Sequence, residues 1–257
     1  MTLIAIVMGT LAAGIGSVWL AALLGFGVLA RYTQHMLSLA AGALLATAFM
    51  HLLPEAFESQ ASAHDLFMTL LVGLVFFFLL DKAELWHHGH EHHHNHSPSQ
   101  GNHGQAPISG SWAVLTGDSV HCFGDGVLIA SAFMADTRLG VIASLAVLAH
   151  EVPHHMGDLA VLRTSASNKR AAFVKVSLAG AVTALGGLVG YWLVDNLRDY
   201  LPYFLVVASS SFVYVALADL IPQLQKRLSA RETFAQIAWL LVGIALVATV
   251  SSLAHAH

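Results

Sequence analysis

The chain has 257 residues, of which 56% are apolar and only 10% are charged. Soluble domains carry about 25% charged residues, so the composition excludes an ordinary soluble domain and indicates an integral membrane protein. The formal net charge of −4 offers no basic surface for nucleic acid, and no phosphate loop or nucleic-acid motif is found in the sequence. With Cys122 as the single cysteine, no intrachain disulfide is possible.

Eight stretches of the sequence are apolar over about the 20 residues that a bilayer span requires. Backbone polar groups must be paired within the protein in lipid, so we expect all eight to be helices and the fold to be all-α. The first stretch is interpreted as a retained span, because no basic residue precedes Arg31 as a signal peptide would require. The expected spans are 2–29, 36–57, 66–86, 111–134, 139–162, 171–194, 201–223 and 233–254.

Lysine and arginine are distributed unevenly between the two sides of this arrangement. If both termini lie outside the cytoplasm, Arg138 and Arg198 fall on the outer side and the other nine of the eleven basic residues fall on the inner side. These nine are Arg31, Lys82, Arg163, Lys169, Arg170, Lys175, Lys226, Arg227 and Arg231. The positive-inside rule therefore predicts that both termini are outside the cytoplasm.

The second span ends in the sequence HLLPEAFE, which places His51 one helical turn before Glu55. Residues four apart share a face of a helix. The pair is a candidate entrance site for a cation, and a solvated helix end is the alternative. In the sixth span, four small residues predict close contact with a neighbouring helix. They are Gly180, Gly186, Gly187 and Gly190.

One long connection, 87–110, carries eight histidines between His87 and His103. It has too few apolar residues to form a core, so we expect it to be disordered. Imidazole binds zinc, copper, nickel and iron, and the charge rule places the connection in the cytoplasm. Weak metal capture is the predicted role, with a solvated linker as the alternative. The residues expected to capture metal are His87, His88, His90, His92, His93, His94 and His96.

The fourth span carries the sequence HCFGDG at 121–126. Its His121 and Asp125 are four residues apart and share one face of the expected helix. Asp118 joins this face one turn earlier, and Cys122 borders it. The fourth span is therefore expected to present a row of metal-ligating side chains.

The fifth span carries HEVPHHMGD at 150–158, which contains two further pairs with the same spacing. His150 pairs with His154, and Glu151 pairs with His155. Pro153 removes a backbone donor from the helix and frees a carbonyl near these pairs. A kink at this point would open space beside the ligands.

Polar groups at the bilayer centre are costly, at about 2.5–3.5 kcal/mol for a charged side chain on insertion scales, and they usually mark an ion path. Nitrogen and carboxylate ligands suit Zn²⁺ and also admit Fe²⁺, Mn²⁺ and Cd²⁺. We therefore predict transport of a divalent metal, with zinc foremost, through a site between the fourth and fifth helices. The metal is the substrate, and no organic cofactor is expected. Structural polar contacts between helices are the alternative.

Two other activities fit parts of the pattern. The sequence HEVPH at 150–154 matches the H-E-x-x-H motif of zinc proteases, in which glutamate is the general base. Proline between the two histidines disfavours this, so the chain is not expected to be an enzyme. The H-x-x-x-D spacing resembles cation diffusion facilitators, which export metal but commonly have six spans and a cytosolic domain. A regulatory metal sensor, which binds zinc without net flux, is a third class.

HCFGDG resembles the fourth-helix signature H-N-F-x-D-G of ZIP (Zrt/Irt-like) metal transporters. HEVPHHMGD resembles the fifth-helix signature H-E-x-P-H-E-x-G-D of the branch that carries histidine-rich loops, and HLLPEA and YVALADLIP also resemble that branch. The resemblance implies a ZIP-like bundle, a binuclear metal centre and import into the cytoplasm, often by a homodimer, as one helix bundle moves against another. A bacterial plasma membrane is the expected location, with an organelle membrane as the alternative.

The resemblance also implies roles for individual residues. Primary-site ligands would be His121, Asp125, His150 and His154. Glu151 matches a second-site position, His154 and Asp125 are candidates to bridge the two sites, and His51 matches a pathway position. Cys122 departs from the usual asparagine and His155 from the usual glutamate. Because the second change removes a negative charge, the second site is expected to be electrically poor.

Overall fold

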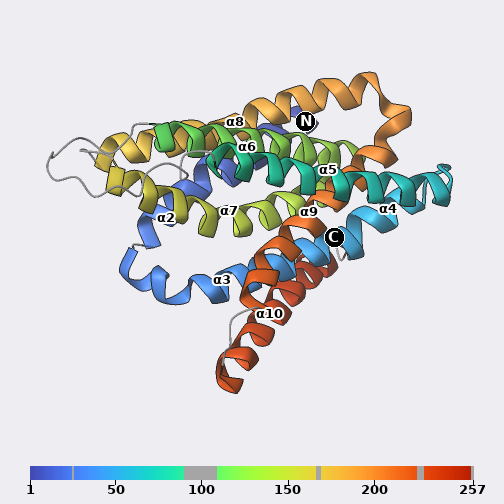
Figure 1. Ribbon diagram of the computed structural model, residues 1–257. Helices are drawn as coiled ribbons and strands as arrows, with labels where there is room; N and C mark the ends of the chain where they lie inside the picture. The colour runs from blue at the N-terminus through green and yellow to red at the C-terminus, as the bar shows by residue number, and fades with distance from the viewer. Residues whose placement is uncertain (25, 90–108, 166–168, 225–228, 256–257) are drawn as a thin grey trace, which may run out of the picture.

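The computed structural model describes the chain except for residues 25, 90–108, 166–168, 225–228 and 256–257. The described residues form helices and short turns with no strand (Figure 1). They make eight long helical passes. In chain order, the elements are α1 (Thr2–Leu11), η1 (Ala12–Gly16), α2 (Ser17–Leu24), α3 (Phe26–Thr47), η2 (Ala48–Leu52), α4 (Leu53–Phe57), α5 (Ala63–Gly89), α6 (Ser109–Ala135), α7 (Thr137–Ser165), α8 (Lys169–Asn196), η3 (Arg198–Tyr200), α9 (Leu201–Leu224) and α10 (Ala230–His255).

Six segments of the described chain are long and apolar enough to cross a membrane. They are Thr2–Leu24, Gln34–Phe57, Ala63–Leu80, Arg170–Asn196, Arg198–Ala218 and Ala230–Val250. The two helices outside this set are α6 and α7, which carry the polar motifs. The all-helical membrane fold is therefore confirmed, whereas the count of eight spans and the outward termini stay predictions.

Several helices extend beyond the expected spans. α3 begins at Phe26 rather than after Arg31, because arginine is a good helix former and does not end a helix. The expectation of disorder throughout 87–110 is wrong at both ends, since α5 continues to Gly89 and α6 begins at Ser109. Adding residues to a helix that has already formed is easy, even where the sequence becomes polar.

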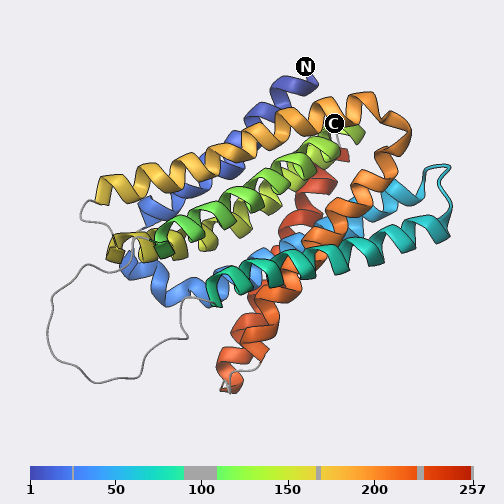
Figure 2. The same cartoon turned by 45° about the horizontal axis from the view of Figure 1, so that its top comes forward.

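The passes form two helix bundles, seen best in Figure 2. The first bundle contains α1–α2, α6, α7 and α8, and the second bundle contains α3–α4, α5, α9 and α10. α6 packs most extensively against α8, through glycines. A side chain at Gly126 would overlap Thr183 O and lie 2.7 Å from Gly187 N. The predicted close contact along the sixth span is therefore confirmed.

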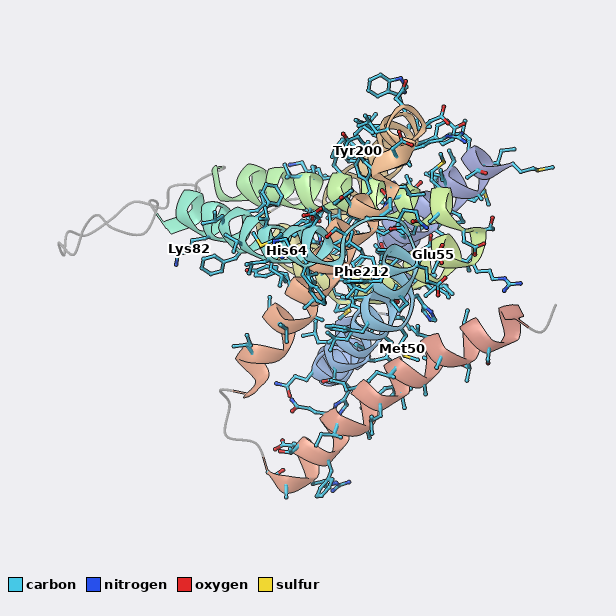
Figure 3. All side chains as sticks on the ribbon, turned by 90° about the vertical axis from the view of Figure 1, so that its right-hand side faces the viewer. Met50, Glu55, His64, Lys82, Tyr200 and Phe212 are labelled. Atoms are coloured by element: carbon cyan, nitrogen blue, oxygen red, sulfur yellow. The ribbon has the colours of Figure 1, made fainter. Side chains whose placement is uncertain are left out.

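The outer surface of the molecule is largely apolar. Leu23, Leu178, Trp192 and Phe234 are exposed, while Phe212 is enclosed among the helices (Figure 3). Buried hydroxyl groups bond to their own helices, as when Thr47 Oγ1 donates to Ala43 O at 2.8 Å, Thr10 Oγ1 to Ile6 O at 2.8 Å and Ser131 Oγ to Val127 O at 2.9 Å. An apolar exterior around internally satisfied helices is what a multi-pass membrane protein requires.

Two π-helical turns interrupt the first two passes. η1 separates α1 from α2 and ends immediately before Ser17, while η2 separates α3 from α4 and contains His51. A π-turn inserts an extra residue into the helix and often marks a functional site. The sequence pattern did not predict either turn.

Candidate metal centre

The two motif-bearing helices are joined by a tight turn at Asp136. α6 ends at Ala135, α7 begins at Thr137, and the Arg138 N–H donates to Asp136 Oδ1 at 2.7 Å, which caps the start of α7. His121 and His150 lie 15 and 14 residues from Asp136. At 1.5 Å per residue, both are about 21–23 Å from the turn. The two motifs therefore meet at the same depth of the bundle.

Four side chains converge in what we call the primary group: His121, Asp125, His150 and Glu151. His121 Nε2 lies 3.0 Å from His150 Nε2, and each of these nitrogens is 3.8 Å from Asp125 Oδ2. Glu151 Oε1 lies 3.4 Å from His121 Nε2 and 3.2 Å from His150 Nε2. One donor atom from each residue falls within 4.8 Å of the others, so a single ion could contact all four.

The primary group is buried and short of hydrogen bonds. Asp125, His150 and Glu151 are 4%, 3% and 1% exposed. Among the described residues, Asp125 Oδ2 and both carboxylate oxygens of Glu151 have no hydrogen-bond partner. Burying a carboxylate is costly unless it is paired or coordinates a metal. The ligand types and the unsatisfied oxygens therefore fit a divalent cation.

A second group contains Asp118, Cys122, Glu151 and His155, whose donor atoms also lie within 4.8 Å of one another. His155 Nε2 is 3.2 Å from Glu151 Oε2, 3.7 Å from Asp118 Oδ1 and 4.0 Å from Cys122 Sγ. All four residues are buried. Glu151, which the resemblance places at a second site, is thus joined there by a second carboxylate, a thiol and an imidazole.

Glu151 is the residue that the two groups share. Its Oε1 faces the primary group and its Oε2 faces the second group. The sequence suggested Asp125 and His154 as bridging residues, but of these described residues Asp125 belongs to one group and His154 to neither. His154 lies at the edge, exposed, with its ring stacked on that of His121 at a centroid distance of 5.4 Å.

A cavity of about 340 Å³ opens beside the primary group. One wall is formed by His121, Asp125, His150 and His154, and the opposite wall by residues of α5 and α9, including Phe77 and Tyr214. The centre therefore lies where the first helix bundle faces the second helix bundle.

His51 and Glu55 lie away from this centre. Together with Glu58, Asp136 and Arg138 they line a separate cavity of about 430 Å³ at the end of the molecule that carries the α6–α7 turn. Figure 3 shows Glu55 and Lys82 on opposite sides of the view. The candidate entrance residues therefore line a cavity that shares no lining residue with the cavity beside the centre.

The structure adds one residue that the sequence did not suggest. Ser17 Oγ lies 2.9 Å from His155 Nδ1, although the two residues are 138 positions apart. A serine in an apolar span has no local signal that marks it as a partner of a distant histidine.

Around Pro153, α7 continues without a break. The candidate capture histidines from His90 to His96 lie outside the described residues, and His87 and His88 have no described side chains.

A buried cluster of imidazole and carboxylate groups inside a multi-pass helical bundle defines a membrane protein that handles metal ions. Comparison with known families agrees: the model of the ZIP zinc transporter family matches residues 82–251. The chain belongs to the ZIP family. Because this family consists of transporters, the protease interpretation of HEVPH is set aside, and so is the cation diffusion facilitator interpretation.

Several relatives share this similarity. The chain is 35% identical to human zinc transporter ZIP10 over 143 residues, which is 54% of this chain and 17% of that protein. It is 27% identical to zinc transporter ZIP13 of Pongo abelii over 236 residues, covering 85% of this chain and 66% of the relative. For human ZIP4, the identity is 29% over 259 residues, with 78% and 40% covered. The chain thus spans between about one sixth and two thirds of these relatives.

Proposed function

We propose that the protein carries a divalent metal ion, zinc foremost, across the membrane into the cytoplasm through the site between α6 and α7. The observation that carries this proposal is the primary group, in which two imidazoles and two carboxylates converge within 4.8 Å. Similarity to proteins named zinc transporters supports zinc as the substrate. Fe²⁺, Mn²⁺ and Cd²⁺ are further candidates, because the same ligand types accept them.

The cavity lined by His51, Glu55 and Glu58, which we call the outer cavity, serves as the entrance of the proposed path. Glu55, Glu58 and Asp136 give it negative charge, and His51 offers a first imidazole. Acidic walls raise the local concentration of cations. The ion would then exchange its remaining water for the primary ligands, which must bind weakly enough to release it.

The second group is the natural second position of the ion. It shares Glu151 with the primary group, so an ion can change position while one carboxylate stays bound through its other oxygen. A thiol and an imidazole suit zinc and cadmium better than manganese. The negative charge that is lost with histidine at position 155 is replaced by Asp118, which brings a second carboxylate to this position.

The two helix bundles provide a way to open the path alternately to each side. The first bundle is held together by glycine contacts between α6 and α8, and the centre lies at its border with α5 and α9. Because the glycine contacts are tight, the first bundle is expected to move as one body against the second bundle. The primary ligands belong to that body and would travel with it.

The setting of the transporter follows from the charge distribution and the family. Both termini would face outward and 87–110 would face the cytoplasm, where its histidines would accept arriving metal. A bacterial plasma membrane is the proposed location, with an organelle membrane as the alternative. A homodimer is the proposed assembly, and native mass spectrometry from nanodiscs tests it.

Zinc uptake into sealed proteoliposomes tests the transport proposal, with an internal fluorescent indicator as the readout. Wild type should accumulate zinc, and His150→Ala should reduce the initial rate to near the level of empty vesicles. His64→Ala is the matched control, because His64 is exposed at the start of α5. Zinc binding without uptake by wild type would instead indicate a sensor.

A further inference from the structure

The side chain of Ser17 occupies an unusual position for a serine in an apolar span. Both Ser17 and His155 are completely buried. Ser17 Oγ donates to Gly14 O at 2.6 Å and lies 2.9 Å from His155 Nδ1. A hydroxyl group has one proton to donate. Because Gly14 O receives that proton, His155 Nδ1 must be the donor in the second bond.

This assignment fixes the tautomer of His155. With its proton on Nδ1, a neutral imidazole has its lone pair on Nε2. That nitrogen points at Glu151 Oε2, Asp118 Oδ1 and Cys122 Sγ, at 3.2, 3.7 and 4.0 Å. A lone pair facing carboxylate oxygens gains nothing unless a cation lies between them. In metal sites, a histidine ligand characteristically donates its other N–H to a fixed acceptor.

The local fold explains how Ser17 comes to face α7. Gly14 lies in η1 against α8, where a side chain would overlap Gly180 O and lie 2.6 Å from Thr183 Oγ1. The absence of a side chain lets the first pass approach α8 closely. The π-turn alters the usual hydrogen-bond spacing, and the hydroxyl that follows it bonds a carbonyl three residues earlier. The same geometry holds the hydroxyl oxygen against His155.

We infer that Ser17 is a positioning residue for the second group: it holds His155 as the Nδ1–H tautomer, so that Nε2 and Cys122 Sγ ligate a soft divalent cation such as Cd²⁺ or Zn²⁺. This inference rests on the proposed function, since it concerns the second position on the same path. It goes further in assigning the ligand atom of His155 and a role for the first pass. The alternative is a histidinium that forms a structural ion pair with Glu151.

Cadmium binding to the purified full-length protein tests the inference. Thiolate-to-cadmium charge transfer absorbs in the ultraviolet, and Cys122 is the only cysteine, so the band reports on the second group alone. Wild type should show the band, and Cys122→Ser should lack it. Loss of a partner of a ligating histidine typically weakens metal binding about 10–100-fold. Ser17→Ala should therefore need about 10–100 times more cadmium to develop the band.

Matched variants separate positioning from general loosening of the fold. Ser131→Ala removes a buried hydroxyl that bonds to its own helix on α6, and it should leave the cadmium titration unchanged. In a His155→Ala background, Ser17→Ala should cause no further weakening, because Ser17 acts through His155. If Ser17→Ala does not fold, the similarly shaped pair Ser17→Thr and Ser17→Val replaces it. The threonine should keep the band and the valine should weaken it.

Three results would overturn the inference: no band in wild type, equal shifts for Ser17→Ala and Ser131→Ala, or a Ser17→Ala titration identical to wild type. The last is the result that a structural ion pair gives. Zinc flux tells this failure apart from failure of the proposed function. Uptake that depends on His150, together with a cadmium band that does not depend on Ser17, leaves transport intact and rejects only the role of Ser17.

Discussion

Glu151 and His155 are joined by a 3.2 Å contact between Oε2 and Nε2, while the other oxygen of the same carboxylate lies 3.2 Å from His150 Nε2. One side chain thus connects two groups of metal-ligating residues. Neither oxygen has a hydrogen-bond partner among the described residues. The carboxylate is held in place by the helices and left available to a cation.

Glu151→Gln should uncouple metal binding from stability. The amide has nearly the same shape but no charge, so the metal-free protein should be at least as stable as wild type. Ligand at about 100 times its Kd stabilises a protein by about 2.7 kcal/mol. Wild type should show such a gain with zinc in a thermal unfolding assay, and Glu151→Gln should lose most of it.

The control for this change is Glu232→Gln, an exposed carboxylate in the first turn of α10. Its zinc-induced stabilisation should match wild type. An equal zinc effect in Glu151→Gln would show that the shared carboxylate contributes nothing to binding.

Two glycines in α6 offer a matched test of helix packing. A methyl group at Gly126 would overlap Thr183 O, whereas nothing lies within 4 Å of a methyl group at Gly124. Gly126→Ala should destabilise the protein by about 1–3 kcal/mol, as overpacking does. Gly124→Ala should be neutral or stabilising by up to about 1 kcal/mol, because alanine favours helix. Denaturation in detergent with the same assay compares the two, and equal stabilities would contradict the close α6–α8 contact.

Zinc binding should weaken as the pH falls. Imidazoles bind metal only when deprotonated, so protons compete with zinc at His121 and His150. The apparent zinc affinity should therefore drop as the pH is lowered. Calorimetry in buffers with different ionisation enthalpies should detect proton release. In His150→Ala the number of protons released should be smaller, and a pH-independent affinity in wild type would argue against imidazole ligands.

The charges of the outer cavity should affect how readily zinc enters the path rather than how fast bound zinc is transported. Glu55→Gln combined with Glu58→Gln removes two of its negative charges. Zinc uptake should then need a higher zinc concentration for half-maximal rate, while the saturated rate stays close to wild type. The defect should shrink at high ionic strength, because salt screens such steering. A lower saturated rate with unchanged half-saturation would place these residues elsewhere on the path.

Deleting 90–103 tests the role of the histidine tract while leaving α5 intact. The deletion removes six of the eight histidines between His87 and His103. Zinc flux into proteoliposomes should persist, because the proposed transport ligands lie on α6 and α7. Zinc bound per protein at equilibrium should fall. Complete loss of flux would show that the tract is part of the path.

The sequence was most informative where a helical repeat carries the chemistry. Spacing of four residues predicted that His121 would share a face with Asp125 and His150 with His154, and the resemblance paired the two helices. Which oxygen of Glu151 faces which partner depends on the rotation of α7 against α6, and no sequence repeat records that rotation. Ser17 was missed for the same reason, since its contact with His155 depends on a π-turn and a close approach to α8.

The most direct measurement is the location of zinc itself, by anomalous diffraction at the zinc edge from crystals of the zinc-loaded protein. We expect a peak within the primary group, with ligand distances of about 2.0–2.2 Å to imidazole nitrogen and carboxylate oxygen. A peak confined to the outer cavity, with His121 and His150 bonded only to protein, would contradict the claim that these buried side chains hold the transported ion.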